Sequence, residues 1–301
     1  MNWRELLQPR PVEHHAFERV AMRVLFAWVV WRHVPGSLAH LEITAPHGVA
    51  RWFDLRFLLD PQVYTWCTYG LWVALALYVL RIGWSVALPY MAVLSIGVGT
   101  VINSQGAIAH YLQIVSLVLC AQTAAHFYSL FGIRDLTAAA YRAAAEDRVV
   151  RWSQQAIVAT YLVSALTKLL KTNGLWFFQS PLLAVQITKT NDQDYYDRLD
   201  TASYEAGAAV AEWMVQNPLL VGLVLSTGLL LELTAPLVLF ARWLALGYGL
   251  ALVLFHMTVH QMMKLNFLFN EYLLWIYLVN VPFWILFALR FGQRRMARAP
   301  A

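Results

Sequence analysis

The chain has 301 residues, of which 60% are hydrophobic and only 13% are charged. This balance is typical of a protein that crosses a membrane several times, and it excludes an ordinary soluble globular protein. The net charge of +5 does not indicate a nucleic-acid partner, because Arg and Lys collect in the cytoplasmic loops of membrane proteins. We therefore expect an integral, multi-pass membrane protein whose principal partner is the lipid bilayer.

Apolar segments, taken in chain order, predict an all-α bundle of about eight transmembrane helices. A helix needs about 20 mainly apolar residues to cross the hydrocarbon. The first segment is the weakest, because Arg23 and Arg32 interrupt it; without it the bundle has seven spans. The predicted spans cover residues 20–33, 64–80, 84–102, 106–127, 150–168, 218–240, 243–263 and 267–289.

The segments between and beside these spans are short. We divide the chain into a polar N-terminal segment (1–17), a transmembrane domain (18–290) and a basic tail (291–301). Residues 135–148 are rich in alanine and predict an amphipathic helical loop between the fourth and fifth spans. Aromatic residues near 176–187 predict a re-entrant or interfacial helix, because aromatic side chains favour that depth.

Basic residues are distributed unevenly between the two sets of loops. Arginines gather before the first span, after the second, between the fourth and fifth, and after the last. Because cytoplasmic loops carry the excess of Arg and Lys, this pattern predicts that both termini are cytoplasmic.

Lys168 is the most informative single residue, because it follows the apolar run of the fifth span. An ammonium group in hydrocarbon costs about 2.5–3.5 kcal/mol on insertion scales. Two interpretations are open. Either the side chain extends to the outer headgroups and keeps its charge in water, or loss of water favours the neutral amine, which can act as a base.

Other ionisable residues are predicted to lie at a depth similar to that of Lys168. The expected topology places His110 near the outer end of the fourth span. It places His256 and His260 in the outer half of the seventh span, about 6 Å apart along one face. Glu232 lies within the sixth span. Intramembrane ionisable residues indicate function by default; the alternative is that the histidines bond backbone carbonyls and Glu232 bridges two helices.

His256 and His260 also form an HxxxH pair. A metal site needs two or more further ligands, and we expect no metal site here. A metal-dependent lipid oxidase is the remaining interpretation of this pair.

The order of several short motifs resembles that of a known family. The motifs are AHY at 109–111, ALTKL at 165–169, GLW at 174–176, LLELT at 230–234 and FHM at 255–257, with Gln261 just beyond. Their order resembles the HTTM (horizontally transferred transmembrane) domain family, which includes the membrane domain of vitamin K-dependent γ-glutamyl carboxylase. The resemblance covers roughly residues 15–290.

The resemblance implies a quinol-linked enzyme, which in the carboxylase is a lyase. There, a lysine in the matching helix deprotonates vitamin K hydroquinone, and O2 and CO2 then take part in carboxylating a glutamate. By this resemblance Lys168 is the base, and His110 and His256 are further catalytic groups. The residues implied to bind the quinone are Tyr111, Trp176, Glu232, His260 and Gln261.

The implied cofactor is reduced vitamin K or another lipophilic quinol, with O2 and CO2 if the carboxylase chemistry is kept. A protein or peptide substrate would then meet the enzyme on the outer side. The animal carboxylase has a large lumenal region that binds the propeptides of its substrates. The sequence here ends at Ala301, soon after the last predicted span, so we expect the quinol chemistry and leave glutamate carboxylation open.

A second class of function also stays open. A non-enzymatic membrane protein, either a transporter or an assembly partner, fits a predicted topology without a soluble catalytic domain. Against a transporter, the sequence shows no inverted repeat and no pair of Gly/Pro-broken spans in matching halves.

Overall fold

The computed structural model describes residues 13–106, 108, 110–132 and 137–296. Within this part of the chain all regular elements are helices and no strand is present, which confirms the predicted all-α fold. The α-helices are α2 (Ala16–His33), α3 (Pro61–Leu80), α4 (Trp84–Asn103), α5 (His110–Gly132), α6 (Ala138–Lys171), α7 (Trp176–Gln179), α8 (Leu183–Arg198), α9 (Thr201–Gln216), α10 (Pro218–Leu233), α11 (Arg242–Met263), α12 (Leu268–Leu273) and α13 (Val281–Met296). The shorter elements are 3₁₀-helices η1 (Gly48–Arg51), η2 (Arg56–Leu59), η3 (Ser180–Leu182) and η4 (Ala235–Leu239), and π-helix η5 (Leu274–Val279).

Five helical segments in the described chain are long and apolar enough to cross a membrane. They are α3, α4, most of α5, α11, and the run through α12, η5 and α13. The number is six if α9 and α10, which meet at an angle of 105°, count as one broken span. These segments indicate an integral, multi-pass membrane protein. The outer faces of α3, α4 and α11 expose Trp66, Val93 and Leu254, as suits contact with lipid chains.

The predicted count of eight spans is not confirmed, because two predicted segments are less apolar than the others. α2 corresponds to the first predicted span and carries Arg23 and Arg32 within 18 residues. The fifth predicted span is the C-terminal part of α6, where Gln154, Gln155 and Lys168 dilute the apolar run. Neither helix is among the candidate spans.

Two predicted segments have different boundaries in the structure. The described part of the predicted loop 135–148 is not a separate element, because it continues without a break into the fifth predicted span as the 34-residue α6. The predicted sixth span, 218–240, is two helices, since α10 ends at Leu233 and η4 follows. Pro236 has no N–H to donate to the carbonyl of Glu232, so the α-helical ladder cannot continue there.

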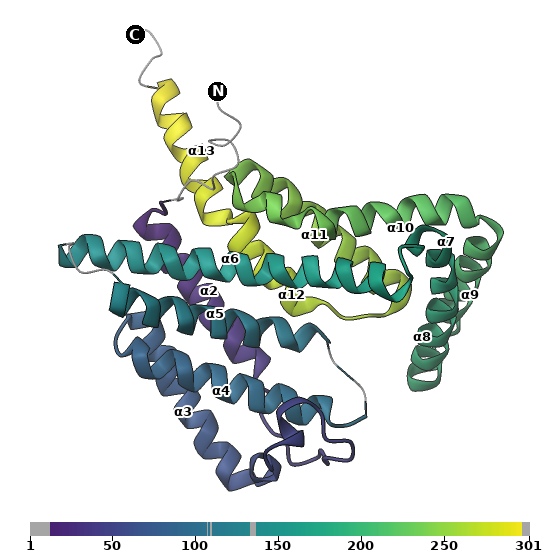
Figure 1. Cartoon of the computed structure of the whole chain (residues 1–301), viewed down its shortest axis with the longest axis horizontal. Helices are drawn as coiled ribbons and strands as arrows, with labels where there is room; N and C mark the ends of the chain where they lie inside the picture. Colours follow the sequence, from purple (N-terminus) through teal and green to yellow (C-terminus); the bar gives the residue numbers. More distant parts are fainter. Residues whose placement is uncertain (1–12, 107, 109, 133–136, 297–301) are drawn as a thin grey trace.

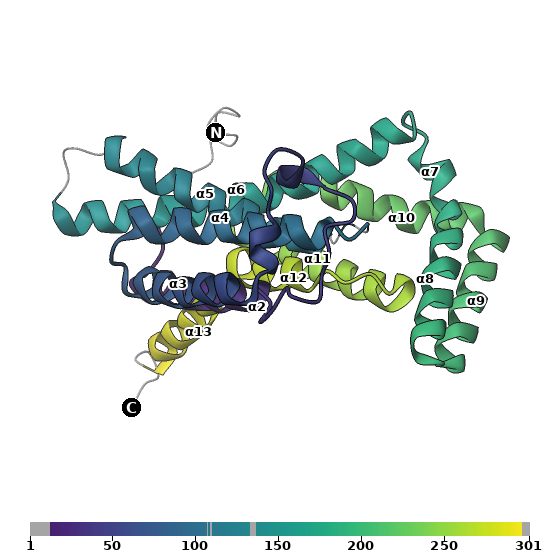
Figure 2. The ribbon, with the colours of Figure 1, turned by 90° about the horizontal axis from the view of Figure 1, so that it is seen from below.

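Residues 176–187 are helical, as predicted, but the helix continues well beyond them. After the short helices α7 and η3, α8 extends to Arg198 and packs against α9 as a hairpin. This hairpin stands across one end of α6 in both views (Figures 1 and 2). Gly207 of α9 allows the close approach, because a Cβ there would lie 2.4 Å from Asn191 Cγ of α8.

Local signals explain where the membrane helices begin and end. The Asp60 carboxylate caps α3 by accepting the backbone N–H groups of Gln62 and Val63 at 2.8 and 2.9 Å. Pro61 occupies the first helical position, where its missing N–H costs nothing. Arg81 ends α3 in the left-handed conformation at φ 62°.

α6 lies at the centre of the arrangement that positions the polar residues. It contacts α5 along one side and α10 and η4 along another (Figure 1). One large hydrophobic core joins α2, α3, α4, α5, α6, α11, α12 and η5, and a smaller core lies between the α8–α9 hairpin and the neighbouring ends of α10 and α11.

Charged side chains gather near the N-terminal end of α6. Glu146 forms ion pairs with Arg19 and Arg81, whose Nε atoms lie 3.0 and 3.1 Å from its carboxylate oxygens, and it also pairs with Arg23. A rise of about 1.5 Å per residue separates Glu146 from Lys168 by about 33 Å along α6. This distance is close to the thickness of the hydrocarbon core, about 30 Å.

Candidate functional site

The site is centred on an ion pair between α6 and α10. Lys168 lies in the last turn of α6, and its ammonium donates to Glu232 Oε2 at 2.5 Å. Glu232 lies in the last turn of α10. The side chain of Glu232 is 5% exposed and that of Lys168 is 28% exposed. The carboxylate is therefore the interior member of the pair, and the ammonium is the member that can be reached from outside the protein.

Two further side chains complete the surroundings of this pair. Ser164, one helical turn before Lys168, lies beside the Glu232 carboxylate. The Lys168 ammonium lies 5.7 Å from the centroid of the Trp176 ring, a distance at which the ring face attracts a cation. The indole Nε1–H of Trp176 is buried without a hydrogen-bond partner.

The short contact between Lys168 and Glu232 permits proton exchange. Moving one proton from Nζ to Oε2 converts an ion pair into a neutral amine and a neutral acid. Low-dielectric surroundings penalise the charged forms and not the neutral ones.

A second polar contact lies two helical turns before Lys168. The Tyr161 hydroxyl and His256 Nε2 are 2.7 Å apart, and both side chains are buried. The His256 ring stacks on Phe267 with ring centroids 4.6 Å apart. Its other nitrogen, Nδ1, is buried without a partner. His256 also lies within electrostatic range of Lys168, so the two contacts belong to one site.

One face of α6 supplies the residues that hold this site together. Tyr161, Ser164 and Lys168 are spaced by three and four residues, and such positions lie on the same side of a helix. Asn270 of α12 lies near Tyr161 and is buried, with its Oδ1 unpartnered. The face therefore collects groups from α10, α11 and α12.

Some of these residues were predicted from the sequence and others were not. The structure brings together Lys168, Glu232, Trp176 and His256, all of which the sequence singled out. It adds Tyr161, Ser164, Asn270 and Phe267, which the sequence did not indicate. The spacing of Tyr161 and Ser164 relative to Lys168 could have revealed those two residues.

Other predicted site residues lie outside this group. Tyr111 stacks on Phe269 with ring centroids 5.9 Å apart. The ring of His260 is exposed, and its Nδ1 lies 3.1 Å from the carbonyl of Leu265. Gln261 is also exposed. His110 begins α5, and its side chain falls outside the described residues.

Neither a metal site nor a similar known protein assigns a function to these residues. Among the described residues, no group of three or more His, Cys, Asp or Glu side chains could hold a metal ion. No protein-family model matches the chain, and no match was found among curated proteins or among solved structures.

Proposed function

We propose that this protein is a quinol-linked membrane enzyme resembling the HTTM family, in which Lys168 deprotonates a lipophilic hydroquinone. The observation that carries the proposal is the 2.5 Å contact between Lys168 and Glu232 at the end of two helices. The contact gives the lysine a partner that can hold its proton. A lysine that only extended to the headgroups would have no need of a carboxylate that is 5% exposed.

The polar and aromatic groups around the pair fit a quinol. Trp176 and Phe267 present ring faces, and the unpartnered Trp176 Nε1 and His256 Nδ1 offer polar atoms nearby. A planar ring that carries hydroxyl groups matches both features. A bound quinol supplies an acidic hydroxyl and two reducing equivalents.

The proton route follows from the different exposures of the two partners. While the pair is ionised, the ammonium has no free electron pair and cannot act as a base. Transfer of its proton to Glu232 Oε2 leaves a neutral amine at Lys168. The amine then accepts the proton of a quinol hydroxyl and is again an ammonium. Glu232 is thus the internal proton acceptor, and Lys168 is the group that meets the substrate. The exposed ammonium then releases one proton to water, and the amine takes back the Glu232 proton, which restores the ion pair.

We also propose the finer topology. α2 and α6 cross the membrane together with the apolar helices, giving about eight passes, and both termini face the cytoplasm. The separation of about 33 Å between Glu146 and Lys168 along α6 supports a crossing. The arginines gathered at the Glu146 end favour the cytoplasm for that end. Lys168 then faces the outer side, where a protein or peptide substrate would be met if carboxylation is kept.

The test uses the full-length protein in lipid nanodiscs with vitamin K hydroquinone as the probe. Oxygen-dependent loss of the hydroquinone is followed by liquid chromatography. General-base catalysis contributes about 10²- to 10⁴-fold, so Lys168→Ala should lower turnover by at least about 100-fold. Lys171→Ala is the matched control, because Lys171 is exposed in the next turn, and it should retain wild-type turnover.

Further results separate the proposal from its alternatives. Glu232→Gln should also lose turnover, since the amide cannot accept the lysine proton. Mass spectrometry of the purified wild-type protein should detect a bound quinone. Unchanged quinol turnover in Lys168→Ala would refute the role of the lysine. Solute flux into liposomes that does not depend on Lys168 would instead support a transporter.

A further inference from the structure

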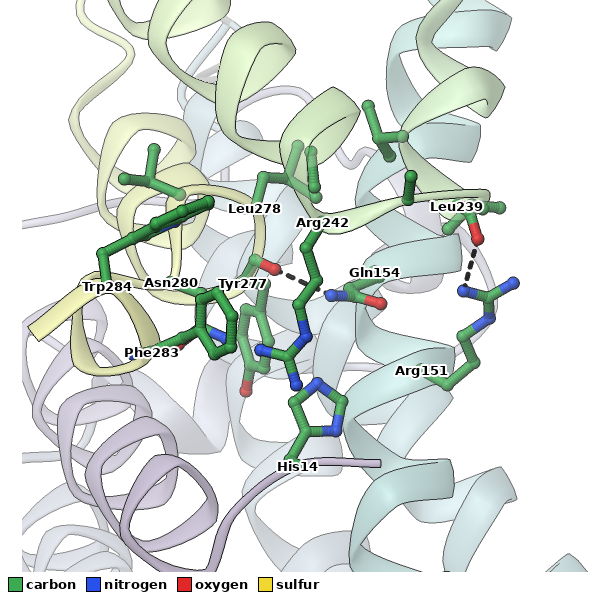
Figure 3. A pocket seen from close by; sticks show the side chains of 14 residues that line it. His14, Arg151, Gln154, Leu239, Arg242, Tyr277, Leu278, Asn280, Phe283 and Trp284 are labelled. Carbon is green, nitrogen blue, oxygen red and sulfur yellow. Dashed lines mark hydrogen bonds between the residues drawn. The ribbon is translucent and has the colours of Figure 1, made fainter. Parts of the chain in front are cut away.

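A hollow lies near the other end of α6, far from Lys168. It is partly open and is lined by parts of α6, η4, α11, η5 and α13 together with His14. Figure 3 shows Gln154 between the side chains of Arg151 and Arg242 in this hollow. The proposed quinol chemistry uses none of these residues.

Arg151 brings an uncompensated positive charge to the hollow. Its Nη1 donates to the carbonyl of Leu239 at 2.8 Å. Among the described residues it has no carboxylate partner. A guanidinium has five donor hydrogens arranged to bind two oxygens at once, and one backbone carbonyl leaves most of them available.

Arg242 is held rigidly on the same hollow. It donates to Glu18 Oε2 at 2.7 Å and to the carbonyl of Glu13 at 2.8 Å, and its guanidinium lies 4.0 Å from the centroid of the Phe283 ring. Asn280 holds the same carboxylate by a 2.9 Å hydrogen bond. The hollow therefore has a fixed guanidinium on one wall, paired with a buried carboxylate.

Positive charge exceeds negative charge around this end of the molecule. Within the described chain, four arginines share only three carboxylates in ion pairs. The arginines are Arg19, Arg23, Arg81 and Arg242, and the carboxylates are those of Glu18, Glu146 and Asp147. Arg151 adds to the surplus. The N-termini of α11 and α13 also border the hollow, and helix N-termini favour anions. An anion would balance this charge.

The surroundings of the hollow are suited to a lipid. Trp284 lines it, and the ring of the 60% exposed Trp243 lies 6.3 Å from that of Trp284. Tryptophan is enriched at the membrane–water boundary. The hollow also borders π-helix η5, whose Tyr277 carbonyl accepts from Gln154 at 2.8 Å, and π-helical turns are frequent at functional sites.

We propose that this hollow binds the phosphate group of an anionic lipid headgroup, with Arg151 as the principal ligand and Arg242 as the second cation. Basic pockets between helices at the membrane boundary bind such headgroups. The site is independent of the Lys168–Glu232 pair, so binding here does not depend on whether the protein oxidises a quinol.

The test uses the full-length protein in nanodiscs that contain equal amounts of phosphatidylcholine and phosphatidylglycerol. Native mass spectrometry counts the lipids that stay bound after release. The wild type should retain phosphatidylglycerol preferentially, and Arg151→Gln should reduce this retention roughly fivefold or more. Arg148→Gln is the matched control, because Arg148 contacts Ser129 and Tyr128 and lines no part of the hollow; it should bind as the wild type does.

Each alternative outcome is decisive. Equal retention of the two lipids by the wild type overturns the proposal, even if Arg151→Gln fails to fold. Equal loss in the Arg151 and Arg148 variants overturns the assignment to the hollow. Displacement of phosphatidylglycerol by millimolar inorganic phosphate overturns the lipid assignment and identifies a soluble phosphate as the ligand.

Discussion

Replacing Glu232 with Gln removes the carboxylate from the bridge to Lys168 and keeps the size of the side chain. At 2.5 Å, two opposite charges attract by about 6–7 kcal/mol if the effective dielectric constant is about 20. Burial of the carboxylate offsets much of this attraction, because the ion has left water. A hydrogen bond between charged groups contributes about 1.5–3 kcal/mol net.

We therefore expect Glu232→Gln to lower the free energy of unfolding by about 2 kcal/mol. This loss is smaller than the about 3–5 kcal/mol for breaking a fully buried pair, because Lys168 is 28% exposed and its ammonium can turn towards the membrane boundary. Lys168→Met should also be destabilising. The double variant should lose less than the sum of the two single losses, by about 2 kcal/mol.

The assay is reversible unfolding of the four proteins by SDS in mixed micelles, followed by tryptophan fluorescence. Lys171→Met is the control, because this exposed lysine should contribute less than about 0.5 kcal/mol. Losses that add to within about 0.5 kcal/mol would refute the conclusion that Lys168 and Glu232 interact, and with it the proposed proton transfer.

Two further predictions concern packing and pH. Gly249→Ala places a Cβ 2.9 Å from a side chain of η5 and should destabilise the fold by about 1–3 kcal/mol. Gly247→Ala meets nothing within 4 Å and should be neutral or stabilising, so equal effects on the unfolding free energy would contradict this packing. Burial raises the pKa of Asp147, but hydrogen bonding and charge from His14 and Arg19 outweigh burial and lower it overall. Its contribution to the free energy of unfolding is thus present above the ordinary pKa of about 3.9 and lost as the pH falls below that value. In Asp147→Asn the free energy of unfolding should fall less steeply with decreasing pH in this acid range. The same steepness as in the wild type would contradict the pairing.

The helices could be predicted where a strong apolar run coincides with clear end signals. α3 and α4 lie close to their predicted bounds, since Asp60 and Pro61 begin α3 and Arg81 and Gly83 separate the two helices. The prediction was less accurate where polar residues dilute the run, as in α6, or where a proline breaks it, as after α10. Hydropathy describes a segment on average and does not locate a break within it.

The site could be predicted only in part, for a related reason. Lys168 and Glu232 were recognisable as ionisable groups in apolar surroundings, but their direct contact was not. Asn270 gave no signal, because an asparagine near a helix start is ordinary in sequence. The hollow beside Arg151 gave none either, because its walls come from five elements and from His14.

By itself, the sequence determined that the chain is helical, that it is a multi-pass membrane protein and that an ionisable lysine follows an apolar run, because composition and local periodicity are properties of short segments. Only the tertiary structure decided that Lys168 meets Glu232, that Tyr161 meets His256 and that Arg151 has no carboxylate partner in the described chain. Contacts between helices depend on the rotation and the axial shift of each helix, and these are set by packing across the whole bundle. The lysine was therefore visible in the sequence, whereas the carboxylate that it contacts became visible only in the fold.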